Sequence, residues 1–124
     1  MTSRKHRRYK LLLDEGVHLP QKFPNLNKRH NVFHIAQSKY RGKSDEFVFN
    51  LAEKEGRMPV VYNTKHFKSF MSLKAASVIS VSTVLTDKQA DLKICKALKI
   101  LTPGKLKGHL IKISPRGIQI NKIY

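Results

Sequence analysis

The chain is poor in cysteine, in acids and in long apolar runs. Its single cysteine excludes an intramolecular disulfide and fits a reducing compartment. No run of 18 apolar residues is present, so no membrane span is expected. The run Leu11-Leu12-Leu13 is followed at once by Asp14 and Glu15, which makes it too short for a signal-peptide core.

Acids are outnumbered by bases across the whole chain. The 124 residues hold 25 Lys and Arg against 8 Asp and Glu, so the formal net charge is +17. A soluble domain of this size usually carries a net charge of roughly 2–8, because a larger surplus repels itself. A polyanionic partner would neutralise the surplus, and nucleic acid is the first expectation. An anionic membrane is the second, but the N-terminal segment lacks the apolar face that membrane binding requires.

Residues 1–43 are predicted to form an extended basic arm that binds RNA. Prolines 20 and 24 argue against regular structure in its middle, while 8–13 could form a short helix and 32–35 another short element. Tyr9 and Tyr40 could stack on bases or simply pack. The RNA-binding residues expected here are Arg4, Lys5, Arg7, Arg8, Lys10, Lys28, Arg29, Lys39, Arg41 and Lys43.

Residues 44–124 are predicted to form a compact globular domain. Ser44 is a good N-cap for a helix that Gly56 would end. Residues 59–62 suit a short extended piece, and Phe67, Phe70, Met71 and Lys74 fit one face of a second helix. Alternation of β-branched residues predicts a strand within 77–86.

The remainder of this domain combines one ambiguous segment with one clear hairpin. Residues 92–101 fit either a strand or a helix with lysines outward. On either side of Ser-Pro-Arg-Gly, three residues alternate between apolar and polar. This pattern predicts a C-terminal β-hairpin. The fold class expected is α+β, or small α/β, with two helices and three to five strands. After Asp91 the chain has no acid, and Lys105, Lys107 and Arg116 are further expected RNA contacts.

Metal binding and catalysis have little support in the residue pattern. His30 and His34 have a spacing that could chelate on a helix, but a zinc site would need two more ligands. The acids are few, and no serine, histidine and aspartate stand in a recognised catalytic context. No catalytic residue, metal, cofactor or small-molecule substrate is therefore expected. A nuclease remains the enzymatic alternative, with acids such as Glu53 or Glu55 in the catalytic role.

Three stretches stand out between residues 47 and 110: Arg57-Met58-Pro59-Val60, the turn at 82–87 and the segment 92–100, Leu-Lys-Ile-Cys-Lys-Ala-Leu-Lys-Ile. In these stretches the chain resembles the archaeal and eukaryotic large-subunit ribosomal protein eighteen, of the fifteen/eighteen family. The resemblance implies that 92–101 is a strand. The long basic C-terminal extension and the Gly-Gly of that family are absent, and residues 1–43 do not resemble its N-terminus.

A second resemblance is to large-subunit ribosomal protein thirty-two. Val61-Tyr62-Asn63-Thr64-Lys65-His66-Phe67 resembles one of its motifs, and 77–100 resembles its strand, turn and helix. Its Trp-containing arm motif is missing, since the chain has no Trp. Both resemblances imply a structural component of the large ribosomal subunit in the cytoplasm, with ribosomal RNA and neighbouring ribosomal proteins as partners. An RNA-binding factor outside the core ribosome is the alternative, and a lineage-specific ribosomal protein is a third reading.

Overall fold

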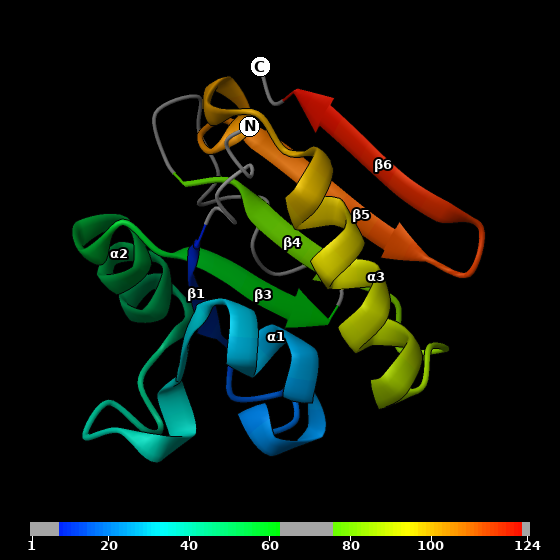
Figure 1. Ribbon diagram of the computed structural model, residues 1–124. Coiled ribbons are helices and arrows are strands. Elements are labelled where there is room, and N and C mark those ends of the chain that lie inside the picture. Colours follow the sequence, from blue (N-terminus) through cyan, green and yellow to red (C-terminus); the bar gives the residue numbers. More distant parts are fainter. Residues whose placement is uncertain (1–7, 63–75, 123–124) are drawn as a thin grey trace, which may run out of the picture.

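The computed structural model describes residues 8–62 and 76–122, and a mixed sheet forms their centre. The strand order is β2-β1-β3-β4-β5-β6. Neighbouring strands from β2 to β5 pair in parallel, and β6 pairs antiparallel with β5 at the outer edge (Figure 1). The strands are β1 (Lys10–Leu13), β2 (Asn31–His34), β3 (Met58–Tyr62), β4 (Val78–Val81), β5 (His109–Ser114) and β6 (Gly117–Lys122).

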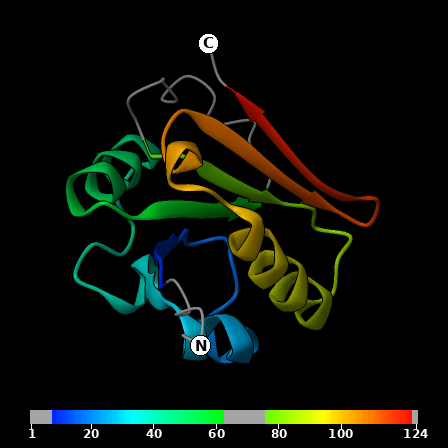
Figure 2. The ribbon, with the colours of Figure 1, turned by 45° about the horizontal axis from the view of Figure 1, so that its top comes forward.

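Helices cover both faces of the sheet. In the described residues they are α1 (Pro24–Arg29), α2 (Asp45–Glu55) and α3 (Asp87–Ile100). Leu11 and Leu13 of β1 join the cluster that contains the apolar residues of α1 and α3, while Leu12 packs against Val48 and Ala52 of α2. Figure 2 shows α2 apart from α1 and α3. The expected mixed class is confirmed, and the described residues alone contain three α-helices and six strands.

The expected extended arm is wrong for residues 8–43. They supply β1, α1 and β2, and β1 lies inside the sheet between β2 and β3. The expected helix at 8–13 is a strand whose three leucines are fully buried. A parallel strand covered on both faces takes an uninterrupted apolar run, which explains why this segment shows no alternation. Residues 1–7 of the expected arm lie outside the described residues.

Several local predictions are confirmed. The Ser44 hydroxyl accepts the Phe47 N–H of α2 at 3.2 Å, and Gly56 ends that helix with φ 68°. Residues 58–62 form β3, and β5 and β6 form the predicted hairpin. The strand predicted within 77–86 is the shorter β4. The helix predicted around Phe67 and Met71 lies outside the described residues.

Residues 92–101 resolve as a helix rather than the strand that the resemblance to protein eighteen implies. Residues 92–100 belong to α3, which begins with a capping box, and Leu101 is its C-cap. The Thr86 hydroxyl accepts the Gln89 N–H at 3.1 Å, and the Gln89 side-chain oxygen accepts the Thr86 N–H at 2.9 Å. This reciprocal pair satisfies two amides at the helix start. In the described parts of the chain, no helix is long and apolar enough to cross a bilayer.

Candidate nucleic-acid interface and acidic edge

Many of the predicted RNA-binding cations lie at the N-terminal edge of the sheet, where the parallel strands begin. Arg8 and Lys10 are exposed at the start of β1, and Lys28 and Arg29 end α1 just before β2 begins. Arg4, Lys5 and Arg7 lie outside the described residues. Cations in the last turn of a helix interact favourably with the helix dipole, so Lys28 and Arg29 also stabilise α1 itself.

A second part of the predicted set lies near the opposite edge. Lys39, Arg41 and Lys43 are exposed in the loop before α2. The Lys39 ammonium lies 5.4 Å from the centre of the Tyr40 ring, and that of Lys43 lies 5.4 Å from the Phe47 ring. Arg116 is exposed in the β5–β6 turn. The structure therefore divides the predicted arm residues between two edges of one domain.

The segment that carries Lys105 and Lys107 is held through its backbone. The Ser77 hydroxyl donates to the Lys105 carbonyl at 2.6 Å and accepts the His109 N–H at 3.1 Å. Both lysine side chains are exposed. Lys107 and Lys10 line one hollow of about 170 Å³, which Glu53 shares. The fold thus brings together Lys10 from the basic N-terminal segment and Lys107 from the acid-free part of the chain after Asp91.

The aromatic residues proposed to stack on bases are used for packing. Tyr9 is buried, and its hydroxyl donates to the Leu101 carbonyl at 3.2 Å. Tyr40 packs against Phe47 with ring centres 5.3 Å apart. Packing, the alternative left open from the sequence, therefore accounts for both rings.

The two closely spaced histidines have structural partners. His30 directly precedes strand β2, and His34 is the last residue of that strand. The two residues are therefore not on one face of a helix, which chelation by this spacing would require. Nδ1 of His30 accepts the Tyr9 N–H at 3.1 Å. Nε2 of His34 donates to the Val17 carbonyl at 2.6 Å, and its Nδ1 accepts the Ala36 N–H at 3.0 Å. Within the residues described, no three His, Cys, Asp or Glu side chains are grouped to hold a metal ion.

The C-terminal edge of the sheet, where the parallel strands end, gathers most of the acids. Asp14 and Glu15 follow β1, while Asp45 and Glu46 begin α2 and Asp87 begins α3. In an open parallel sheet, ligands bind beyond the carboxyl ends of the strands, at the point where the strand order reverses. Here that point lies between β1 and β3, where Asp14 stands. We name these five residues the acidic edge.

Asp14 is the most deeply placed member of the acidic edge. Burial raises the pKa of its carboxyl above the ordinary value, and the negative charges of Asp45 and Glu15 raise it further. The backbone N–H groups of Glu15 and Gly16 act in the opposite direction. The loops are tied together, since the Glu15 carboxylate accepts the Gly42 N–H at 2.9 Å. The fold therefore places acids 31 residues apart close enough to repel each other.

A histidine extends this edge toward β3. Nδ1 of His18 lies 2.6 Å from a carboxylate oxygen of Asp87, and the His18 ring meets the Tyr62 ring edge-on. Burial raises the pKa of the Tyr62 hydroxyl, and the Asp87 charge adds to that rise. The residues of this edge come from segments that are distant in the sequence and that only the fold brings together. The one sequence signal was Asp14-Glu15 directly after an apolar run.

Sequence reasoning also missed Asp91, a buried acid on α3. It is 2% exposed, and its carboxylate accepts the N–H groups of Asn25 and Leu26 at 3.0 and 2.8 Å. The Asn25 amide donates a third bond at 3.0 Å. Because α1 has no side-chain cap of its own, Asp91 caps it from another helix. The available signal was an acid at an apolar position of the α3 pattern.

Comparisons with known proteins returned no match to any family model, any curated protein or any solved structure.

Proposed function

We propose that the protein binds RNA, mainly through contacts to the phosphate backbone. One observation carries this proposal: nine of the predicted cations in the described part of the chain form no ion pair with a carboxylate. Within the described chain, no ion pair neutralises Arg8, Lys10, Lys28, Lys39, Arg41, Lys43, Lys105, Lys107 or Arg116. Backbone phosphates would neutralise them and release condensed counterions.

Within this proposal, the RNA is ribosomal and the protein is a cytoplasmic structural component of the large subunit, beside other ribosomal proteins. The sequence resemblances and the charge support this reading. An RNA-binding factor outside the core ribosome is the alternative. The two differ in stoichiometry, because a core component stays at one copy per subunit through a high-salt wash and a factor is lost.

Crosslinking of the full-length protein to RNA in cell extract, followed by sequencing of the attached RNA, tests this proposal. We expect crosslinks at a few sites of large-subunit rRNA. Crosslinks scattered over mRNA or tRNA would overturn the ribosomal reading and leave RNA binding intact. Absence of crosslinks above background would overturn RNA binding itself.

A second candidate function is hydrolysis of phosphodiester bonds at the acidic edge. The observation that favours it is the position of Asp14 at the reversal point of the strand order, half-buried, with the charge of Asp45 near enough to help raise the pKa of its carboxyl. A divalent cation relieves repulsion between carboxylates, and Mg²⁺ is commonly held by one or two carboxylates together with substrate phosphates. A metal held there could activate water and stabilise the departing oxygen.

Cleavage of a fluorogenic RNA with Mg²⁺ or with EDTA tests the second candidate. Hydrolysis should require Mg²⁺ and should disappear in Asp14→Asn and Asp45→Asn. Glu53→Gln removes the acid that the sequence offered for the catalytic role, and it should retain activity if hydrolysis takes place at the acidic edge. Equal cleavage by the wild-type protein and Asp14→Asn would sink the candidate.

A further inference from the structure

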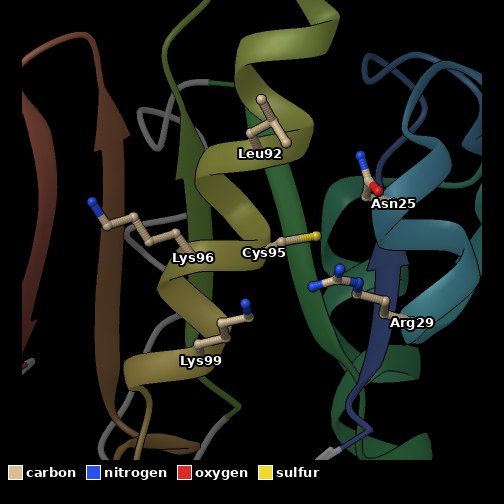
Figure 3. Close-up of a pocket in the computed structure, with 6 residues that line it drawn as sticks. All are labelled: Asn25, Arg29, Leu92, Cys95, Lys96 and Lys99. Carbon is tan, nitrogen blue, oxygen red and sulfur yellow. The ribbon is translucent and has the colours of Figure 1, made fainter.

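A basic groove lies between α1 and α3, apart from the acidic edge. It is lined by Asn25, Arg29, Leu92, Cys95, Lys96 and Lys99, and its volume is about 360 Å³. Residues 92, 95, 96 and 99 recur at helical spacing, so they form one stripe along α3. Asn25 and Arg29 face that stripe from α1 (Figure 3).

Two cations from different helices converge in this groove. Figure 3 shows the Cys95 sulfur directed toward α1 and the Arg29 guanidinium directed toward α3. Burial raises the pKa of the Cys95 thiol, and Asp91 adds to that rise, while the charges of Arg29 and Lys99 oppose it. Both cations are therefore near the thiol. Lys96 points away from α1 and stands at the rim (Figure 3).

Asp91 of α3 does not line the groove. It is buried, and its two carboxylate oxygens accept three hydrogen bonds from Asn25 and Leu26. No carboxylate is among the residues that line the groove. Leu92, which is 53% exposed, gives one end an apolar surface. The groove thus offers two cations beside a neutral thiol, with an apolar contact next to them.

We infer that this groove is a backbone subsite for single-stranded RNA, in which Arg29 and Lys99 hold one phosphate and Leu92 contacts the adjoining sugar or base. Arg29 supplies the forked donor that suits phosphate oxygens, and Lys99 supplies a second, mobile charge. The inference rests on the proposed RNA binding and identifies one of its contact sites. Lys99 was expected only as one of the outward lysines of 92–101, and Arg29 was expected to act from an extended arm.

Fluorescence anisotropy with a labelled single-stranded RNA, titrated over a range of salt concentrations, tests this subsite. The test variant is Arg29→Gln with Lys99→Gln. The matched control is Lys88→Gln with Lys112→Gln, which removes the same charge from exposed positions outside the groove. Each phosphate contact contributes about 0.7 to the log–log salt slope on single strands, so the test variant, which loses one such contact, should lower that slope by about 0.7. The control should change it little.

The single cysteine gives a second readout, because labelling of the chain reports only on Cys95. RNA should slow alkylation of Cys95 in the wild-type protein and in the control variant, but not in the test variant. Millimolar inorganic phosphate should give much weaker protection than RNA. Protection by phosphate alone equal to that by RNA would overturn the assignment to a nucleic-acid backbone.

Two further results separate this inference from the proposed function. If wild type binds RNA and both double variants weaken binding equally, the groove is not a subsite and RNA binding stands. If wild type shows no salt-dependent RNA binding, the proposed function and the subsite fail together. Circular dichroism of both variants verifies that any loss arises from a folded protein.

Discussion

At the scale of single residues, Asp91 illustrates how an acid can serve the fold rather than a ligand. Its carboxylate accepts three hydrogen bonds at the start of α1 from a buried position on α3. The negative charge also suits the positive end of the helix dipole. The residue joins two helices whose sequences are 66 positions apart at this contact.

Replacement of Asp91 by Ala should therefore be costly. It leaves buried N–H groups without an acceptor, so we expect a loss of about 3 kcal/mol in the free energy of unfolding. Asp91→Asn should cost less, because its amide oxygen can still accept. Urea denaturation measures both, with the exposed Glu53→Ala as the control, expected within about 0.5 kcal/mol of wild type. An Asp91→Ala protein as stable as the control would contradict the capping role.

The burial of Asp14 predicts that the free energy of unfolding depends on pH. Its pKa is raised in the folded state from the ordinary 3.8, chiefly by burial, so the folded protein binds this proton more tightly than the unfolded chain does. The stabilising contribution is complete below the unfolded pKa and is lost as the pH rises through the folded pKa. At neutral pH, the ionised Asp14 therefore lowers stability.

Asp14→Asn removes that cost and should raise the free energy of unfolding at pH 7. The advantage should shrink as the pH falls toward 4, where the wild-type carboxyl takes up its proton. Chemical denaturation at several pH values measures the difference, with Glu53→Gln as a control for loss of one acid. A variant less stable than wild type at pH 7 would contradict the burial and repulsion described for this site.

At the scale of elements, local sequence signals located α2 but left α3 undecided. The Ser44 cap, two acids in the first turn and Gly56 mark α2 at both ends. For α3, the apolar residues of 92–101 fit two periodicities, and the deciding signal was the Thr86…Gln89 capping box just upstream. The alternation predicts a strand within 77–86, which would include Thr86, whereas β4 ends at Val81.

The capping box makes a direct prediction for α3. Thr86→Ala removes the hydroxyl that accepts the Gln89 N–H, and we expect it to cost about 1 kcal/mol of stability. Thr83→Ala, in the exposed turn before the helix, should change stability by less than about 0.5 kcal/mol. Thermal or urea unfolding of the two variants measures the difference, and equal effects would argue against the cap.

At the scale of the whole molecule, the described part of the basic N-terminal region, from residue 8 on, contributes to the core. Leu11, Leu12 and Leu13 are fully buried, and β1 bridges β2 and β3. Arg57 fastens the same strands, because its guanidinium donates to the Leu11 carbonyl at 3.0 Å and to the Asn31 side chain at 2.9 Å. A boundary at residue 43 would cut through this sheet.

A fragment of residues 44–124 should therefore not fold alone. It would expose the β1 side of β3 and the faces of α2 and α3 that pack on residues of 9–35. We expect no cooperative thermal transition by circular dichroism and poorly dispersed amide signals in NMR, whereas the full chain should show both properties of a folded protein. A cooperatively unfolding fragment would restore the two-part division expected from charge alone.

Composition and neighbours within a few residues are enough to predict the charge, the absence of an intramolecular disulfide, the α2 helix, the extended segment at 59–62 and the C-terminal hairpin. The tertiary structure decided the rest. A buried central strand has no alternating pattern, so only its place between two covered faces turns Leu11–Leu13 from a short run into β1. Likewise, Asp14 with Asp45, and Arg29 with Lys99, meet only because the parallel sheet brings distant loops and helices together.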